Sequence, residues 1–205
     1  MDIKEYTQNP CRMLSIPYWK AINLTLPDTV KIVHASEWNG QYKVYERFFR
    51  IKHSLQNFAT IDFDYNIIAI DNQTKQLADM INASYVHENI VVSEEEILRW
   101  KEHKTFRESL WVCIETSDGK MVASGIAEYD EECKEGILEW VQVLPEYRGM
   151  GFGKKIVIAL LNELKKIGAE FATVSGNLDN VTTPLELYKK CGFFGEDVWY
   201  ICRVV

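Results

Sequence analysis

The chain has 205 residues, of which 47% are hydrophobic and 12% aromatic, a composition that suits one globular domain with an ample core. Its net charge of −7 argues against nucleic acid as a partner, because phosphate backbones are bound by clustered lysine and arginine. The five cysteines are odd in number and lack CxxC spacing, which indicates reduced thiols in a cytoplasmic protein rather than a disulfide framework or a zinc site. No segment reaches the roughly 20 apolar residues of a membrane span, so we expect no membrane partner.

Residues 1–57 show no specific pattern, and we interpret them as an N-terminal extension of unknown role. Prolines interrupt residues 1–28, which predicts an irregular arm. Residues 29–34 alternate as a strand does, whereas residues 45–52 fit a strand or a helix, because so short an apolar run does not fix its period. A dimerisation or partner-binding arm is one role that fits, so a homodimer is among our expectations.

A domain is predicted from residue 58 to 205, and it begins with an alternating stretch over residues 58–63. Apolar residues then recur at helical spacing up to Tyr85, which predicts a first helix. Ser93 followed by Glu96 has the spacing of a capping box and predicts the start of a second helix.

Three successive strands are predicted next, over residues 110–115, 121–129 and 136–143. Asp118-Gly119 is a tight hairpin signal between the first two, so these strands should pair in antiparallel order.

The remainder alternates between helix and strand. We predict a helix over residues 151–167, a buried strand over 171–175, a short helix over 183–190, and one or two strands over 193–203. A strand, helix, strand unit implies a right-handed crossover and locally parallel pairing. The expected fold class is therefore α/β (α+β), with a mixed, mostly antiparallel twisted sheet flanked by helices.

A glycine loop joins the strand 136–143 to the helix that follows it. Its sequence is Arg148-Gly149-Met150-Gly151-Phe152-Gly153. Glycines let backbone N–H groups converge, and a helix start adds partial positive charge, so the loop is suited to a phosphate group. The spacing fits neither a P-loop nor the GxGxxG dinucleotide fingerprint. The plain alternative is a buried joint with glycines for close packing, but packing does not call for three alternating glycines behind an arginine.

This loop resembles the Arg-Gly-x-Gly-x-Gly/Ala loop of the GCN5-related N-acetyltransferase (GNAT) superfamily, where it wraps the pyrophosphate of acetyl-CoA. A second resemblance lies at Asn180 and at Leu187-Tyr188 with Gly192-Phe193, which is similar to the superfamily's Asn … Leu-Tyr-x-x-x-Gly-Phe segment. The resemblance implies a GNAT-like acyl-CoA N-acyltransferase fold over residues 58–205, and acetyl-CoA as cosubstrate.

In the superfamily the cosubstrate lies between two parallel strands that splay apart, here residues 136–143 and 171–176. The resemblance implies that the first strand pairs with the pantetheine arm and that the loop amides bind the pyrophosphate. Asn180 is a candidate for the pantetheine or for a helix cap, with Asn177 as the alternative. The expected cosubstrate-binding residues are Val141, Gln142, Val143, Arg148, Gly149, Met150, Gly151, Phe152, Gly153, Lys154, Asn177, Asn180 and Tyr188.

Two residues are candidates for the chemistry. Glu139 lies in a strand that is apolar on both faces, where burial would raise its pKa toward that of a general base; a structural ion pair is the alternative reading, and Glu128 is a less favoured substitute. Tyr188 occupies the position where the superfamily often places a tyrosine near the departing sulfur, although a packing tyrosine would look the same in sequence.

The expected function is an N-acetyltransferase that transfers the acetyl group of acetyl-CoA to a primary amine of a small molecule or peptide. No cysteine lies in a motif, which favours direct transfer in a ternary complex over an acyl-enzyme. The alternative is a non-catalytic acyl-CoA-binding or sensing module. The four histidines are scattered, so we read them as structural or surface residues and expect no metal. The acceptor pocket of this superfamily comes from the early helices and loops, here about residues 65–105, where no pattern identifies the amine.

Overall fold

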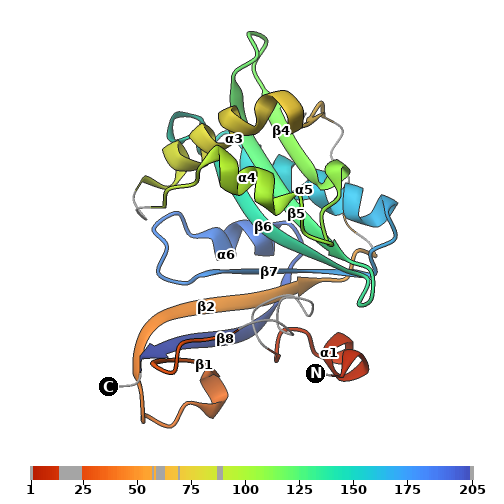
Figure 1. The fold of residues 1–205 in the computed structure, drawn as a ribbon. Helices are drawn as coiled ribbons and strands as arrows, with labels where there is room; N and C mark the ends of the chain where they lie inside the picture. Colours follow the sequence, from red (N-terminus) through yellow and green to blue (C-terminus); the bar gives the residue numbers. More distant parts are fainter. Residues whose placement is uncertain are drawn as a thin grey trace.

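The computed structural model describes residues 2–13, 25–56, 58, 63–68, 70–86 and 90–203. Within these ranges an eight-stranded sheet has the order β1-β8-β2-β7-β6-β5-β4-β3 (Figure 1). The strands are β1 (Val30–His34), β2 (Lys43–His53), β3 (Asn66–Ile67), β4 (Trp111–Glu115), β5 (Met121–Asp130), β6 (Glu135–Val143), β7 (Phe171–Asn177) and β8 (Phe194–Arg203). The pair β6 and β7 is parallel, and the other neighbouring pairs are antiparallel. The predicted mixed, mostly antiparallel sheet is confirmed.

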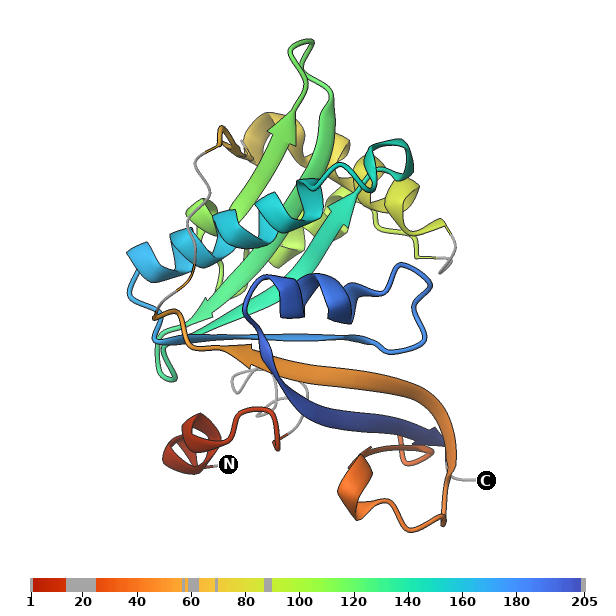
Figure 2. The same cartoon turned by 180° about the vertical axis from the view of Figure 1, so that it is seen from behind.

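Helices cover both faces of the sheet. They are α1 (Ile3–Gln8), α3 (Ile70–Ser84), α4 (Glu94–Trp100), α5 (Phe152–Lys166) and α6 (Pro184–Lys190). Helices α3 and α4 lie on the face turned to the viewer in Figure 1, whereas α5 and α6 lie on the face seen in Figure 2. Within the described chain, no helix combines the length and apolarity needed to cross a membrane.

Helix α5 packs closely on the sheet because two strand positions have no side chain. A Cβ built on Gly125 of β5 would lie 2.4 Å from Ile156, and one on Gly136 of β6 would lie 2.4 Å from Leu164. Ile156 and Leu164 both belong to the buried apolar face of α5 that was predicted from the sequence. The helix therefore sits at a fixed height above β5 and β6, with its N-terminus at the end of β6.

The two early helices and the hairpin also form as predicted. At the start of α4, Ser93 Oγ accepts a hydrogen bond of 3.2 Å from the Glu96 amide, and Glu96 Oε2 accepts one of 2.8 Å from the Ser93 amide. Gly119 adopts a φ of +81° in the turn between β4 and β5. Most of the strand expected at residues 58–63 lies outside the described residues.

The predicted extension contributes to the interior of the sheet. Residues 45–52 are part of β2, which pairs with β7 on one side and β8 on the other. The ambiguous pattern of this stretch has a physical reason: Phe49, Arg50 and Ile51 are all buried, so the strand is covered on both faces and does not alternate. The boundary predicted at 57/58 therefore does not separate two units of the sheet.

The first residues also depart from the irregular arm that we expected, because residues 3–8 form helix α1. Tyr6 anchors this helix: its hydroxyl donates to Glu135 Oε2 at 2.8 Å and accepts from Arg50 Nη2 at 2.8 Å. Arg50 and Glu135 are 1% and 0% exposed and form an ion pair of 3.2 Å. A buried, fully hydrogen-bonded charge pair thus ties α1 to β2 and β6.

Candidate active site

Strands β6 and β7 are paired over only part of their length. Their parallel register runs from Glu135 with Phe171 to Leu138 with Val174 and then ends. Beyond that point β7 continues to pair with β2, and β6 continues to pair with β5. The two strands therefore diverge, and the second half of β6 has an open edge.

A β-bulge lies where the strands part. On β6, Leu138 pairs with Ala127 and Trp140 pairs with Ile126, so Glu139 is the extra residue. A bulge bends its strand and increases the local twist. Its position directly after Leu138, the last residue paired to β7, accounts for the divergence of β6 from its neighbour.

The main chain of two valines faces this open edge. The Leu144 amide donates to the Val122 carbonyl at 3.0 Å, so this is a hydrogen-bonded pair of the β5/β6 ladder. Because such pairs alternate along an antiparallel ladder, the N–H and C=O groups of Val143 and Val141 point away from β5.

The carbonyl groups of the same valines already have partners on that side. Val141 accepts a hydrogen bond of 3.1 Å from the Tyr85 hydroxyl, and Val143 accepts one of 3.3 Å from Arg148 Nε. Gln142 is different, since its main chain turns toward β5 and its side-chain amide donates to Ser124. Of the three strand residues expected to bind the pantetheine arm, Val141 and Val143 thus have the main-chain orientation for it.

The glycine loop leads into the first turn of α5, where backbone N–H groups have no hydrogen-bond acceptor within the helix. Gly149 and Gly151 adopt φ values of +78° and +84°, where side chains are disfavoured. The first bond of the helix runs from the Lys155 amide to the Gly151 carbonyl at 3.1 Å, and no side chain caps the helix. Among the described residues, the amides of 149–154 donate to no protein group. Six amides without a protein acceptor among the described residues and the positive end of a 15-residue helix therefore lie together in one short segment.

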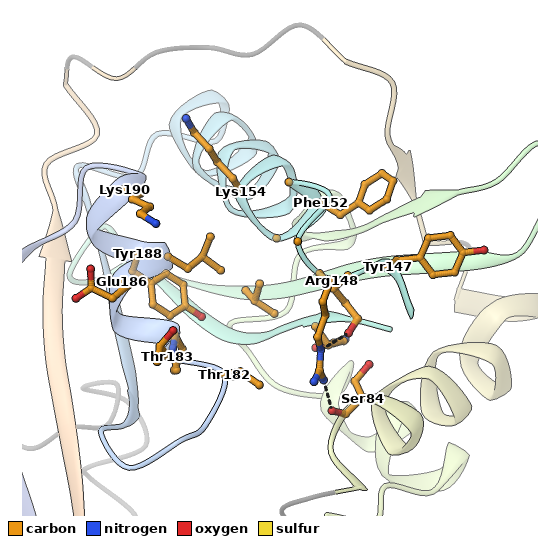
Figure 3. Close-up of a pocket in the computed structure, with 18 of the residues that line it drawn as sticks. Ser84, Tyr147, Arg148, Phe152, Lys154, Thr182, Thr183, Glu186, Tyr188 and Lys190 are labelled. Carbon is orange, nitrogen blue, oxygen red and sulfur yellow. Dashed lines mark hydrogen bonds between the residues drawn. The ribbon is translucent and has the colours of Figure 1, made fainter. Parts of the chain in front are cut away.

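A cavity of about 630 Å³ lies between the open edge of β6, this loop and α6 (Figure 3). Ten of the residues predicted to bind the cosubstrate line it: Val141, Gln142, Val143, Arg148, Gly149, Gly151, Phe152, Gly153, Lys154 and Tyr188. Figure 3 shows Arg148 directed toward Ser84, whose carbonyl oxygen accepts from Arg148 Nη2 at 2.7 Å. Since the Arg148 amide donates to the Pro145 carbonyl, this arginine holds the loop in place, and the free amides begin at the next residue.

Tyr188 of α6 directs its hydroxyl into the cavity (Figure 3). It is 7% exposed, and its ring packs between Phe49 and Phe193 at centroid distances of 6.1 and 5.6 Å. Burial raises the pKa of the phenol well above its ordinary value, and nearby Tyr85 adds to the effect. The phenol is therefore neutral and a hydrogen-bond donor at physiological pH.

Three of the predicted residues do not line the cavity. Met150 is 63% exposed. Asn177 Oδ1 accepts from the Asp179 amide at 2.7 Å, and Asn180 Oδ1 accepts from the Thr182 amide at 2.8 Å. Each asparagine thus forms a turn with the residue two positions on, which shapes the loop between β7 and α6.

Several residues that complete the cavity were not predicted from the sequence. Ser84 and Tyr85 come from the end of α3, Thr182 and Thr183 from the loop before α6, and Lys190 from the last turn of α6. Ser84 Oγ is buried and has no hydrogen-bond partner in the described structure. Only the folded chain brings these residues together.

The expectation that Glu139 is buried is wrong. At the bulge its side chain is exposed, and it lines a second, smaller cavity of about 130 Å³. The other lining residues are Trp100, His103, Phe106, Trp111, Ile126, Glu128 and Trp140. Alternation along β6 predicted burial because it assumed a regular strand, and the bulge breaks that alternation.

Glu128 and His103 lie in the same small cavity. Glu128 is 6% exposed, and its Oε1 lies 3.0 Å from His103 Nδ1, whose side chain is 33% exposed. Sequence reasoning assigned no function to His103, since 25 residues separate it from Glu128. Two carboxylates and an imidazole therefore stand beside the point where β6 leaves β7.

The thiols lie apart from this chemistry. All five cysteines are buried. Burial raises the pKa of Cys191, the nearest to α6, to about 11, and that of Cys113 to about 12. The thiols are therefore protonated and poor nucleophiles at neutral pH.

Comparison with known proteins shows what this chain is similar to. Residues 107–193 match the family model of the acetyltransferase (GNAT) domain. No curated protein matches the chain significantly.

Solved structures with a similar fold include a GCN5-related N-acetyltransferase from Sphaerobacter thermophilus, with a TM-score of 0.69 and 14% identity over 80% of this chain and 52% of that one. A GNAT-family acetyltransferase from Colwellia psychrerythraea has a TM-score of 0.64 and 16% identity over 84% and 64% of the two chains. The GCN5-related N-acetyltransferase from Kribbella flavida has a TM-score of 0.60 and 11% identity over 86% and 68%. The chain thus spans about half the length of the Sphaerobacter protein, and at these identities the likeness is one of fold.

Proposed function

Because residues 107–193 match the family model of the acetyltransferase (GNAT) domain, we propose that the protein transfers the acetyl group of acetyl-CoA to a primary amine, by direct transfer in a ternary complex. The observation that carries this proposal is the opening between β6 and β7, with the donors of residues 149–154 at its mouth. A packing joint would not leave six amides of a loop and helix start without described protein acceptors beside a cavity of this size.

The residues present fit acetyl-CoA. The amides of residues 149–154 and the helix start suit a diphosphate, and Ser84 Oγ is a further polar group with no hydrogen-bond partner among the described residues. The N–H groups of Val141 and Val143 suit the amide oxygens of a pantetheine arm laid along the strand edge. When bound, acetyl-CoA supplies the thioester acyl group and a thiol as leaving group.

The groups that line the small cavity are the candidates for removing a proton from the acceptor ammonium ion. An amine arrives as an ammonium ion and must lose a proton before it can attack. Glu139 is our candidate base, directly or through water, because it stands at the bulge two residues before Val141. The buried Glu128 with His103 is the alternative, in which the carboxylate orients the imidazole.

Two groups stabilise the charges that develop during transfer. The Val141 N–H, directed into the opening, donates to the acyl oxygen as it becomes negative. The Tyr188 hydroxyl donates to the departing sulfur. Its raised pKa favours hydrogen bonding over complete transfer of its proton, because a thiolate is the weaker base.

The test is release of free thiol from acetyl-CoA with a panel of amines, combined with acetyl-CoA binding by calorimetry. We expect thiol release with at least one amine, and loss of turnover without loss of binding in Glu139→Gln. If Glu128→Gln alone abolishes turnover, the base is the Glu128 and His103 pair. Acetyl-CoA binding with no thiol release for any amine would favour the sensing module, and absence of binding would overturn the proposal.

A further inference from the structure

The small cavity at the bulge has a composition that selects one kind of molecule. Its walls carry the rings of Trp100, Trp140, Phe106 and Trp111. Trp100 and Trp140 are stacked at a centroid distance of 5.3 Å, and Phe106 meets Trp111 edge-on at 5.4 Å. Aromatic faces attract cations and pack against methylene groups, but they offer few hydrogen bonds to hydroxyl groups.

The charged side chains of the small cavity also favour a cationic ligand. Glu128 and Glu139 both line it, and the chain as a whole carries a net charge of −7. Carboxylates beside aromatic rings favour a cationic group and repel a molecule with a carboxylate next to its amine.

The cavity is placed for the reaction. Glu139 and Trp140 directly precede Val141, and two strand residues span about 7 Å. The ring of Trp140 also contacts that of Tyr85 at 5.7 Å, and Tyr85 lines the larger cavity. Trp140 thus lines the small cavity and contacts a residue that lines the larger one.

From these observations, and resting on the proposed function, we propose that the small cavity is the acceptor site and that it takes the ammonium end of an unbranched alkylamine. Its volume of about 130 Å³ holds a short chain of methylenes. A cavity of roughly 150 Å³ takes a benzene-sized ligand, so the small cavity would not enclose a hexosamine ring with its hydroxyl groups.

The experiment compares four amines: n-butylamine, tert-butylamine, β-alanine and glucosamine. The first two have equal charge and different shape, and β-alanine adds a carboxylate. We expect kcat/KM for n-butylamine to exceed that for each of the other three amines by about tenfold or more, the order of discrimination that an apolar pocket achieves for a change in the shape of the hydrocarbon part. A parallel titration of the protein saturated with CoA, followed by tryptophan fluorescence, should respond to n-butylamine and not to tert-butylamine.

A variant locates the effect. Trp100→Ala should lower kcat/KM for n-butylamine about tenfold and leave the KM of acetyl-CoA unchanged. Trp38→Ala is the matched control, because Trp38 is 41% exposed and contacts Tyr200 away from both cavities. Should Trp100→Ala not fold, Trp100→Leu with the fluorescence titration provides the same comparison.

The outcomes separate the two proposals. Thiol release with glucosamine or β-alanine at equal or higher kcat/KM than with n-butylamine would overturn the acceptor assignment and leave the acetyltransferase proposal standing. A protein that fails to bind acetyl-CoA would overturn the acetyltransferase proposal itself.

Discussion

The hydroxyl of Tyr85 donates a hydrogen bond of 3.1 Å to the carbonyl oxygen of Val141, and so joins the end of α3 to the open edge of β6. A strand edge without a neighbour has unpaired main-chain groups. This bond occupies the carbonyl group and leaves the N–H of the same residue directed into the opening. The early helices thus help to orient the main chain that we assign to the acyl oxygen.

Tyr85→Phe tests this relationship. The variant keeps the ring against Trp140 and removes the hydrogen bond, so we expect unfolding free energy to fall by about 1 kcal/mol and kcat/KM by roughly fivefold. Urea unfolding and steady-state kinetics measure the two effects. Tyr147→Phe is the control, since Tyr147 lines the same cavity and its hydroxyl has no hydrogen-bond partner in the described structure. Equal effects of the two variants would contradict the assigned role.

Gly151→Ala should weaken acetyl-CoA binding. Gly151 has a φ of +84° with open space around its Cβ position, so alanine there adds backbone strain of about 1 kcal/mol without a clash. Relief of that strain turns the loop amides, and we expect the Kd of acetyl-CoA to rise about tenfold. Gly119→Ala is a close control, because its φ is +81°, its surroundings are equally open and it lies in the β4/β5 turn. Calorimetry should show unchanged affinity for that variant; a similar loss in both would argue against the loop as the anion site.

Tyr188→Phe should lower kcat by about 10², the lower end of what a positioned proton donor contributes, with acetyl-CoA binding unchanged. Only the neutral phenol of Tyr188 can donate a hydrogen bond, and this form is lost as the pH rises through the pKa of the phenol. Because burial raises that pKa, the wild-type rate should show no decline from this group up to about pH 10, the ordinary value for tyrosine. Tyr129→Phe, at the far end of β5, should leave kcat unchanged. A rate that falls between pH 8 and 9 in wild type and not in Tyr188→Phe would contradict the raised pKa.

Two ion pairs of β2 should differ in their contribution to stability. Glu135→Gln leaves the Arg50 charge buried and uncompensated, and we expect a loss of about 3 kcal/mol in unfolding free energy. The Arg47 and Asp179 pair is 53% exposed on each side, so Asp179→Asn should leave the melting temperature unchanged within error. Denaturant unfolding of both variants checks this. Comparable small losses would mean that the buried pair does not hold α1 and β2 in place.

No acetyl group should accumulate on a cysteine. The pKa of Cys191 is raised to about 11 by burial, so its thiol is almost entirely protonated at neutral pH. Mass spectrometry after incubation with acetyl-CoA alone should find the unmodified protein. A stoichiometric acetylated cysteine would contradict direct transfer.

The sequence by itself determined the features that depend on local chemistry. Hydrophobic periodicity located α3, α5 and the strands β4 to β6, and the Ser93 capping box marked the start of α4. The glycine loop could be assigned because positive φ angles and free amides are properties of a few consecutive residues. Tyr188 was found for a similar reason, since its position in a short motif fixes its place on α6.

The tertiary structure decided what depends on residues far apart in the chain. Glu139 is exposed because of the bulge, which arises from the pairing of β6 with β5. The pattern of apolar and polar residues along β6 alone does not reveal such a bulge. Residues 43–53 form an interior strand because β7 pairs with one edge of this segment and β8 with the other. A strand that is covered on both faces shows no alternation of apolar and polar residues, so its sequence does not identify it as a strand. The aromatic cavity is assembled from α4, β4, β5 and β6, so its composition appears only when hydrophobic packing brings these elements together.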